Sequence, residues 1–515
     1  MVKQKRRAAA LTGAFLVTQP RSRTVVVLAA GEGKRMKSDL PKVLHPLLGR
    51  TLVGHVLAAG AQRTLVVVGH RAEQVTAHLS EIAPAAVPVL QAEQHGTGHA
   101  VRLAMAAAPE ATGTVVVLNG DVPLLRPETV AELIDAHESA GAAATVLTAE
   151  VDDPTGLGRI VQDADGGLLR IVEERDATAA ERRIRQINAG IYAVDAAGLR
   201  DALGKLTTDN DQGEEYLTDA VGLLAAAGVP VGVHIAADVT ETLGCNDRVE
   251  LSRLRRLLAD RVNEDWMRAG VSILDPGTTW IDVTVEIGRD AVIDQNTQLR
   301  GATTIGAGAS VGPDVTLIDT TVGAAATVLR SHAVQARVGA GASVGPYAYL
   351  RPEADLAERA KVGTFVEVKK SQIGPGAKVP HLSYVGDATI GARANIGAAT
   401  IFVNYDGVRK SHTTVGESAF VGCDSSLIAP VEIGAGAYVG AGSVVTTDVP
   451  PGALAVTRAA QRVVDGWVRS RRPGTPADEA AARANGGAAV SQTSGGEAAH
   501  HRGAADPHPG DTATD

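Results

Sequence analysis

The stretch from Val338 to Val368 decides the fold of the C-terminal half of this 515-residue chain. It reads VGAGASVGPYAYLRPEADLAERAKVGTFVEV, and every sixth position is aliphatic: Val338, Val344, Leu350, Leu356, Val362 and Val368. A period of six fits neither the 3.6-residue repeat of a helix nor the two-residue alternation of a half-buried strand. It is typical of a left-handed parallel β-helix, in which each hexapeptide supplies a short strand and a turn and the aliphatic residue points inward.

The same period continues on both sides of this stretch, with phase slips. The aliphatic positions before it are Ile287, Ile293, Leu299, Ile305, Val311, Leu317, Val322, Val328 and Val334. Those after it are Val415, Val421, Leu427, Ile433, Val439 and Val445. Since three hexads close one triangular coil, we expect roughly ten coils. Residues 402–414 interrupt the period and contain Asn404-Tyr405-Asp406-Gly407, which predicts a loop that leaves the solenoid.

The N-terminal half follows a different pattern, in which short β-rich runs alternate with helical stretches. Several runs are apolar at consecutive positions, as in parallel strands buried on both faces; they are Thr24–Ala30, Thr64–Gly69, Val115–Leu118 and Ala144–Val151. A helix is expected over Thr129–Ala140. The alternation predicts a Rossmann-like α/β domain with a mostly parallel sheet. Apolar residues three or four apart between Leu251 and Trp266 predict one amphipathic helix that connects the two halves.

Composition limits the class of protein. The net charge of −9 argues against bulk nucleic-acid binding, which normally needs a basic face. The two cysteines, Cys245 and Cys423, supply neither a disulfide framework nor a CxxC metal site. No apolar run approaches the ~20 residues that span a bilayer, so no membrane contact is expected. The basic N-terminus faintly imitates a signal peptide but lacks a small-residue cleavage site, which favours a disordered extension and a cytoplasmic protein.

A glycine turn follows the first strand and reads Gly31-Glu32-Gly33-Lys34-Arg35. Such a turn lets backbone N–H groups approach phosphate oxygens. Its spacing is that of neither a P-loop nor the dinucleotide fingerprint. Asp121 follows another strand and should lie at the carboxyl end of the sheet, where ligands of open α/β sheets bind. These residues alone leave two readings open, a nucleotide site or a phosphate-free turn with a capping Asp.

Longer motifs make a resemblance specific. Leu28-Ala29-Ala30-Gly31-x-Gly-x-Arg35-Met36, followed by Leu40-Pro41-Lys42, resembles the signature of sugar-nucleotide pyrophosphorylases. The segment from Gln91 to Ala100, QAEQHGTGHA, narrows the resemblance. With the hexapeptide region, residues 24–469 are similar to the bacterial bifunctional N-acetylglucosamine-1-phosphate uridyltransferase/glucosamine-1-phosphate acetyltransferase family. That resemblance implies synthesis of UDP-N-acetylglucosamine, a peptidoglycan precursor, by a homotrimer that uses UTP, acetyl-CoA and Mg²⁺.

The resemblance also implies a uridyltransferase site. The implied nucleotide and sugar contacts are Leu28, Ala29, Ala30, Gly31, Lys42, Gln91, Gly96, Thr97, Asn119, Gly120, Asp121, Gly158, Glu173, Asn188, Tyr216, Thr218 and Asn246. Asp121 and Asn246 would hold Mg²⁺. A sugar-1-phosphate oxygen would attack the α-phosphorus of UTP and release pyrophosphate, with Arg35 and Lys42 neutralising charge.

A second, acetyltransferase site is implied in the hexapeptide region. His381 would be the base that accepts the proton of the glucosamine amine, a role that suits imidazole near pH 7. The implied glucosamine-1-phosphate contacts are Arg351, Lys369, Tyr384 and Asn395. The implied acetyl-CoA contacts are Ala398, Asn404, Tyr405, Cys423, Ala441 and Arg458. Three residues depart from the usual family pattern: Lys34 replaces Ser or Thr, Ala399 replaces Gly, and Cys423 replaces Ser.

We expect five segments along the chain. They are a disordered basic extension (1–23), a uridyltransferase domain (24–248), a linker helix (249–271), a hexapeptide acetyltransferase domain (272–470) and a disordered tail (471–515). Two other functions stay open at this point: a uridyltransferase whose solenoid serves only for trimerisation, and a non-catalytic protein that binds a nucleotide-sugar.

Overall fold

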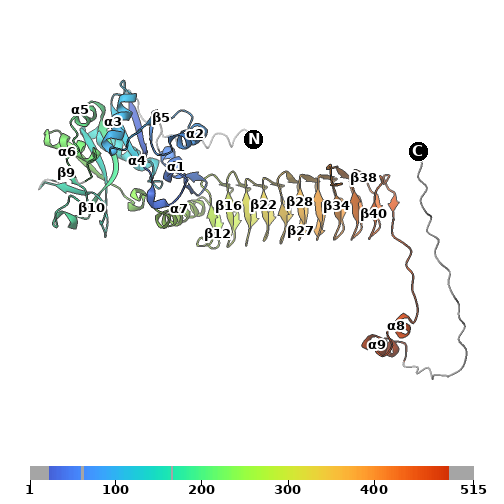
Figure 1. Cartoon of the computed structure of the whole chain (residues 1–515). Coiled ribbons are helices and arrows are strands. Elements are labelled where there is room, and N and C mark those ends of the chain that lie inside the picture. Colours follow the sequence, from blue (N-terminus) through green and yellow to red (C-terminus); the bar gives the residue numbers. More distant parts are fainter. Residues whose placement is uncertain (1–21, 60–62, 164–165, 211, 487–515) are drawn as a thin grey trace, which may run out of the picture. The chain divides into compact units, whose positions relative to one another are not determined.

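The computed structural model describes residues 22–59, 63–163, 166–210 and 212–486. The chain divides into two compact units between Thr457 and Arg458. The first unit contains an N-terminal α/β region, a connecting helix and a stack of short strands (Figure 1). Most of the expected basic extension and the last part of the expected tail lie outside the described residues.

A nine-stranded mixed sheet forms the centre of the N-terminal region, in the order β11-β7-β10-β6-β1-β4-β5, with β8 and β9 attached at β10. The four expected strands are confirmed as β1 (Arg23–Ala29), β4 (Arg63–Val68), β6 (Thr114–Asn119) and β7 (Ala144–Glu150). The others are β5 (Val87–Leu90), β8 (Arg159–Gln162), β9 (Leu168–Val172), β10 (Gln186–Asp195) and β11 (Val231–Ile235). Strands β1, β4, β5 and β6 run parallel, whereas β10 is antiparallel to both of its neighbours in that order.

Helices cover both faces of this sheet, because the apolar strands present side chains to each side. One core contains buried residues of α3 (Thr97–Ala107), α5 (Ala196–Leu203) and α6 (Leu217–Ala226). The core on the other face contains those of α1 (Leu52–Ala59), α2 (Ala72–Ile82) and α4 (Pro127–Ala140). The predicted helix over Thr129–Ala140 is thus confirmed as α4, with Pro127 in its first turn. The architecture is a three-layer α/β sandwich.

The predicted connecting helix is α7 (Arg248–Arg268), whose N-cap Asp247 accepts hydrogen bonds from the N–H groups of Val249 and Glu250. Its Leu251, Leu254 and Leu258 are buried in a small core that they share with residues of the N-terminal region. Farther along α7, Val262 and Trp266 pack against the core of the strand stack. One helix therefore belongs to the packing of both regions.

The strand stack is a triangular prism of three parallel sheets with 11, 10 and 9 strands. It begins at β12 (Ser272–Ile273) and ends at β41 (Leu454–Ala455), and most of its strands have two or three residues. Apart from β39, which pairs with β41, strands of the prism pair with the strand three further along the chain, as in β24 (Ser343–Val344) and β27 (Lys361–Thr364), so one coil contains three strands. The hexapeptide β-helix and the estimate of roughly ten coils are confirmed.

One predicted inward residue is wrong. Val334 is only half-buried, whereas its neighbour Ala333 is buried at the register position between Leu317 and Leu350. Ala333 lies five positions after the inward residue Val328 and five positions before the inward residue Val338, instead of six. Because Ala333 and Val334 are both apolar, spacing alone selected the larger side chain.

The predicted loop is a hairpin between β34 (Ile401–Val403) and β35 (Thr413–Val415). A bridge between Tyr405 and Lys410 and the bonds from the N–H groups of Val408 and Arg409 to the Asp406 carboxylate fix its turn. In the region expected to be a disordered tail, Pro476–Ala484 is instead helix α9, which is N-capped by Thr475. No helix in the described ranges is both long and apolar enough to cross a membrane.

Candidate active sites

A cavity of about 310 Å³ opens where β1 and β6 end. This is the carboxyl edge of the parallel strands, where the sequence predicted a ligand site. The expected nucleotide contacts that line it are Leu28, Ala29, Ala30, Gly31, Lys42, Gln91, Gly96, Thr97, Asn119 and Asp121. Gly120 is behind this wall, and its N–H donates to the Leu28 carbonyl at 2.9 Å.

Three side chains from distant parts of the chain converge at one end of the cavity. The Nζ atom of Lys42 lies 2.5 Å from Asp121 Oδ2 and 3.4 Å from Asn246 Oδ1. Since one ammonium reaches both oxygens, the carboxylate and the amide face a common cation position. One carboxylate and one amide oxygen fit Mg²⁺, which takes few protein ligands and completes its octahedral shell with water and phosphate oxygens. No group of three or more His, Cys, Asp or Glu side chains arranged for a metal occurs in the described ranges.

The loop that carries Asn246 is fixed on both sides. The N–H of Cys245 donates to the Asp121 carbonyl at 2.9 Å, and the N–H of Asn246 donates to Glu250 Oε2 at 2.6 Å. Burial raises the pKa of the Cys245 thiol to about 11, so this thiol stays neutral near pH 7. The bonds hold Asn246 at the start of α7 with its amide toward Lys42.

The glycine turn lies against Lys42 and carries a second cation, Arg35. Gly33 has φ of 65°, and a Cβ atom there would lie 2.7 Å from Lys42 Cβ, so a side chain would push the turn away from Lys42. The turn continues into a short helix, η1 (Lys34–Met36), which is anchored by buried Met36 and by the Arg248 Nε donor to the Met36 carbonyl at 3.0 Å. Arg35 on this helix is exposed and forms no ion pair with any side chain in the described ranges. It does not line the cavity itself.

The opposite wall consists of the turn before α3 and the N-terminus of that helix. Gly96 has φ of 102°, and a Cβ there would lie 2.5 Å from the Glu215 carbonyl oxygen. The buried Gln91 amide donates to the Gly96 carbonyl at 3.1 Å, and Thr97 Oγ1 accepts the N–H of Leu217 at 3.0 Å. The positive end of α3 therefore faces the cavity, which favours a phosphate or an electronegative base edge.

The expected sugar contacts form a cluster of their own. A Cβ on Gly158 would lie 3.4 Å from Glu173 Oε2 and 3.5 Å from Asn188 Cβ. Burial, with nearby Asp176 and Asp219, raises the pKa of Glu173, and a hydrogen bond from Thr218 opposes this rise. Thr218 therefore belongs to this cluster.

A bulge in β10 links the cluster to the cavity. The N–H of Gly190 in the bulge donates to Asn188 Oδ1 at 2.9 Å, and a Cβ on Gly190 would lie 2.3 Å from Asn119 Nδ2.

Tyr216 is buried immediately before α6, and burial raises its pKa.

Sequence reasoning missed four residues that line the cavity: Val43, Gln94, Ala100 and Glu214. Gln94 lies within the motif that carried the resemblance, and its amide donates to the Ala30 carbonyl at 2.7 Å. Its position in this motif, three residues after the expected contact Gln91, could have identified Gln94 as a further lining residue. Nothing in the local sequence distinguishes Glu214 from other loop carboxylates.

In the prism, His381 ends strand β30 (Lys378–His381) and its side chain is exposed at a corner. Its carbonyl accepts the Ser383 hydroxyl at 2.8 Å and the Ala399 N–H at 3.2 Å, which fixes the backbone on the next coil. The imidazole therefore does not face the dry interior of the prism.

Immediately after this corner, charged side chains lie on strands of the neighbouring sheet. Arg351 Nη1 lies 2.9 Å from Glu367 Oε1 on β28 (Glu367–Lys369). Glu367 is in register with Tyr384 on β31 (Tyr384–Gly386), which begins three residues after His381. The prism thereby places two expected glucosamine-1-phosphate contacts, Arg351 and Tyr384, on the coils on either side of the one that carries Glu367.

A second polar group adjoins the first and centres on Asp387. Its Oδ2 lies 2.5 Å from Asn404 Nδ2 and 3.5 Å from Lys369 Nζ, and the Asn404 amide is 3.4 Å from the Tyr384 hydroxyl. Contacts with Lys410 and Asp387 raise the pKa of Lys369, and Lys369 lowers that of Lys410. Sequence reasoning missed Asp387 and Lys410 as site residues. It placed Glu367 in a polar run that the hexads do not require, but assigned it no role.

The expected acetyl-CoA contacts fall on later coils. Ala398 and Cys423 occupy corresponding positions, because the N–H of Asp424 donates to the Ala398 carbonyl and the N–H of Gly442 to the Cys423 carbonyl. Ala441 follows on the next coil, and Asn395 is half-buried on β33 (Asn395–Ile396). Cys423 and Tyr405 are exposed. Arg458 begins the second compact unit, so its place relative to this row stays a prediction.

Comparison with known families agrees with both halves of this architecture. The MobA-like NTP transferase domain matches residues 25–267, and the bacterial transferase hexapeptide, with six repeats, matches residues 412–447. The fold and the two sites define the class as a nucleotidyltransferase joined to a hexapeptide-repeat transferase.

Three relatives narrow the class. The bifunctional proteins GlmU of Streptomyces avermitilis and Thermobifida fusca are 56% and 57% identical to this chain, over 90% of it and over 97% and 98% of their own lengths. GlmU of Corynebacterium aurimucosum is 52% identical over 91% of this chain and 98% of its own length. The chain belongs to the GlmU family of bifunctional proteins. It is an enzyme with N-acetylglucosamine-1-phosphate uridyltransferase and glucosamine-1-phosphate N-acetyltransferase activities, which together make UDP-N-acetylglucosamine.

Proposed function

We propose that uridyl transfer takes place in the cavity at the end of β1 and β6, and acetyl transfer at the prism corner beside His381. The observation that carries the first assignment is the convergence of Lys42, Asp121 and Asn246. The second rests on the exposed His381 imidazole, which precedes Tyr384 by three residues, and on the Arg351–Glu367 and Lys369–Asp387 pairs of the neighbouring sheet. The predicted contacts listed above serve these two sites.

In the first site, a phosphate oxygen of N-acetylglucosamine-1-phosphate attacks the α-phosphorus of UTP, and pyrophosphate leaves. Asp121 and Asn246 would hold Mg²⁺, which would supply charge neutralisation at the phosphates. Lys42 stabilises the negative charge that develops in the transition state, and Arg35 adds a second cation from the exposed edge of the glycine turn. Glu173 and Asn188 bind the sugar. No covalent intermediate with the protein is needed.

In the second site, the amine of glucosamine-1-phosphate attacks the thioester carbonyl of acetyl-CoA. His381 accepts the proton that the amine loses and passes it to the departing sulfur, so that CoA leaves as the thiol. Arg351 and Lys369 neutralise the sugar phosphate, and Tyr384 and Asn395 orient the sugar. Acetyl-CoA lies along the row formed by Ala398, Cys423 and Ala441, with Asn404, Tyr405 and Arg458 as further contacts.

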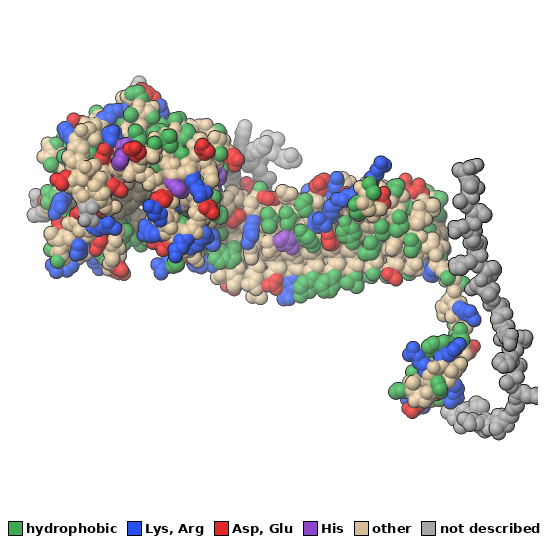
Figure 2. Space-filling view, viewed as in Figure 1, with side chains coloured by type: hydrophobic (Ala, Val, Ile, Leu, Met, Phe, Trp, Pro, Cys, Tyr) green, Lys and Arg blue, Asp and Glu red, His purple; other side chains and the backbone are tan. Residues whose placement is uncertain are grey.

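The functional assembly is a homotrimer built on the prism. Exposed apolar side chains lie along successive coils, and Figure 2 shows rows of them on this part of the surface. Beside His381, one corner carries Tyr347 and Phe365, which stack at 5.3 Å and are 52% and 57% exposed, followed by Leu382 at 57%. An apolar row of this size next to an open polar site supports burial against other copies of the chain.

Uridyltransferase residues 24–248, a linker helix over 249–271 and acetyltransferase residues 272–470 are the functional segments. The enzyme works in the cytoplasm, where UTP and acetyl-CoA are available. Its two cysteines, Cys245 and Cys423, are free, which fits a reducing compartment.

A paired assay on the full chain tests these assignments. With Mg²⁺ we expect pyrophosphate release from UTP and N-acetylglucosamine-1-phosphate, and CoA release from acetyl-CoA and glucosamine-1-phosphate. Chelation of the metal should abolish only the first reaction. Absence of CoA release would favour a uridyltransferase with a structural prism, and absence of both products would favour a non-catalytic protein that binds a nucleotide-sugar.

A further inference from the structure

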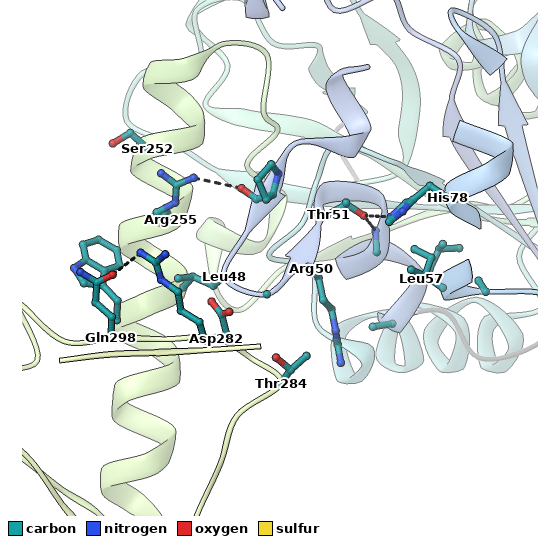
Figure 3. Close-up of a pocket in the computed structure, with 18 residues that line it drawn as sticks. Leu48, Arg50, Thr51, Leu57, His78, Ser252, Arg255, Asp282, Thr284 and Gln298 are labelled. Atoms are coloured by element: carbon teal, nitrogen blue, oxygen red, sulfur yellow. Dashed lines mark hydrogen bonds between the residues drawn. The ribbon is translucent and has the colours of Figure 1, made fainter. Parts of the chain in front are cut away.

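A second cavity, of about 1270 Å³, lies where the N-terminal region, α7 and the first coils of the prism come together. None of its lining residues belongs to either site described above. Figure 3 shows Arg50, Thr51, Leu57 and His78 on the elements of the N-terminal region, opposite residues from α7 and the prism. The cavity therefore exists only because the two regions are joined in one chain.

The walls of this junction cavity are held together by direct contacts. The N–H of Val283 in the first coil donates to the Leu48 carbonyl at 3.1 Å. Arg255 Nη2 on α7 donates to the Pro46 carbonyl at 3.3 Å. Leu48, Leu251 and Leu254 are buried in one apolar core, against which Trp280 and Val283 pack. The cavity is thus a built feature and not a loose gap.

Positive charge predominates in the lining. Arg50 comes from β3 (Arg50–Thr51), Arg255 from α7 and Arg300 from β16 (Gln298–Arg300). None of the three forms an ion pair with a carboxylate in the described parts of the chain. Arg300 instead donates to the Gln298 side chain, and Arg255 donates to a backbone carbonyl. The lining thus contains three guanidinium groups and a single carboxyl group, Asp282, which interacts with Arg300, so its net charge favours an anion.

Asp282 is the one acidic residue among the lining residues, and it is already engaged. Its Oδ2 accepts the N–H of Gly301 at 2.9 Å. Burial raises the pKa of Asp282, and the Gly301 hydrogen bond and the Arg300 charge oppose this rise. One carboxyl group therefore faces three guanidinium groups in the lining.

The rest of the lining is partly apolar and partly polar. Leu57, Ile82 and Trp280 supply apolar surface. Thr51 and His78 share a hydrogen bond of 2.9 Å between Oγ1 and Nε2, and so present a polar edge next to Arg50. Concave sites with apolar walls and a few fixed polar groups are the usual form of small-molecule sites.

We infer that this junction cavity binds a small organic anion, with a phosphate or carboxylate group held by Arg50, Arg255 and Arg300 and an apolar body packed against Trp280 and Leu57. Such a ligand would touch both regions at once, so its binding would stabilise their junction. It would bind at a distance from both catalytic sites and compete with none of their substrates.

Calorimetric titration of the full chain with 1-naphthyl phosphate tests this inference, with 1-naphthol as the neutral partner of the same shape. We expect the phosphate to bind at one site per chain and the naphthol to bind at least about tenfold more weakly. The double variant Arg50→Ala/Arg300→Ala should lose about tenfold or more in affinity, because each charge-assisted hydrogen bond contributes of that order. Its uridyl transfer should stay at the wild-type rate, which also shows that the variant is folded.

Two further variants locate the site. Arg359→Ala removes an exposed guanidinium elsewhere on the prism and should leave the affinity unchanged. Lys42→Ala should also leave it unchanged, because Lys42 lies in the nucleotide cavity. Loss of binding in Lys42→Ala with retention in the double variant would place the probe in the nucleotide cavity and overturn the inference. Equal affinity for naphthol, or no binding of the phosphate by wild type at millimolar concentration, would overturn it as well.

Discussion

In the N-terminal region, the Lys42 ammonium meets Asp121 and Asn246 although these residues are 79 and 204 positions away in the sequence. In the prism, Arg351 and Glu367 meet because they are 16 positions apart, about the length of one coil. The first site is gathered by a sheet whose strand ends converge, and the second by repetition. Contacts within the prism are therefore mostly local, whereas the nucleotide cavity depends on the whole domain.

This difference also separates the sites functionally. The nucleotide cavity is enclosed by its own domain and has a definite volume. The groups around His381 lie on the open outer face of the prism beside exposed apolar side chains. Within one chain, the first site is nearly complete and the second lacks a cover. Substitutions should accordingly affect one activity at a time.

The largest effect should come from His381→Ala. Removal of a general base typically costs about 10²–10⁴-fold in rate, so acetyl transfer should fall by that factor. Uridyl transfer should stay near wild type, because its residues lie in the other region. Assays of CoA release and pyrophosphate release on the same preparation measure both. As a control, His332→Ala removes another imidazole of the prism and should leave both rates unchanged. Loss of both activities in a folded His381→Ala variant would refute the proposal of two independent sites.

Asp121→Ala should give the reverse pattern with a somewhat smaller factor. Loss of one charge that positions the phosphates or their cation costs about 10²–10³-fold in uridyl transfer. Acetyl transfer should not change. The Mg²⁺ concentration for half-maximal activity should rise in the more conservative Asp121→Asn. The matched control is Asp201→Asn, which alters an exposed carboxylate of the same domain. An unchanged Mg²⁺ requirement in Asp121→Asn would argue against Asp121 as a metal ligand.

The repeat made most of the prism predictable, because an inward aliphatic every six residues leaves few other structures. Its failure at Val334 shows the limit. When one hexad is a residue short, either of two adjacent apolar residues fits the spacing, and only stacking against Leu317 and Leu350 decides which one points inward. Stacking likewise brings Asp387 to Lys369, a contact that depends on the length of one coil. Motif residues such as Asp121 were predictable from the resemblance.

Glu214 and Arg50 could not be predicted, because their roles depend on how distant segments pack. The same holds for the junction cavity as a whole. Its walls come from sequence regions that carry no shared motif, and only the folded chain brings their arginines together.

Glu173→Gln should stabilise the N-terminal domain at neutral pH while it weakens sugar binding. Burial raises the pKa of Glu173 above its value in the unfolded chain. The stability linked to this group is therefore present below the unfolded pKa and is lost as the pH rises through the folded pKa. Denaturant unfolding from pH 4 to pH 8 should show a gain for the variant that grows with pH.

The neighbouring residue gives a control of opposite sign. Hydrogen bonding to Arg159 lowers the pKa of Glu174, so its stability contribution is present above the unfolded pKa and is lost as the pH falls. Glu174→Gln should therefore destabilise the domain at pH 7. If both variants change stability in the same direction, the environment of Glu173 differs from the one described.

The smallest effect should come from a substitution at Ala399. This residue lies on the coil that follows His381, at a corner of the prism, and has φ of 59°. A Cβ atom is unfavourable in this left-handed conformation, so Ala399→Gly should relieve strain and stabilise the prism by about 0.5–1 kcal/mol. Ala398 has no positive φ, and Ala398→Gly should instead destabilise by a similar amount, because glycine only adds freedom to the unfolded chain. Thermal unfolding of the two variants measures this difference in sign. Because the Ala399 N–H binds the His381 carbonyl, a changed acetyl-transfer rate in Ala399→Gly would mean that corner strain also positions the base.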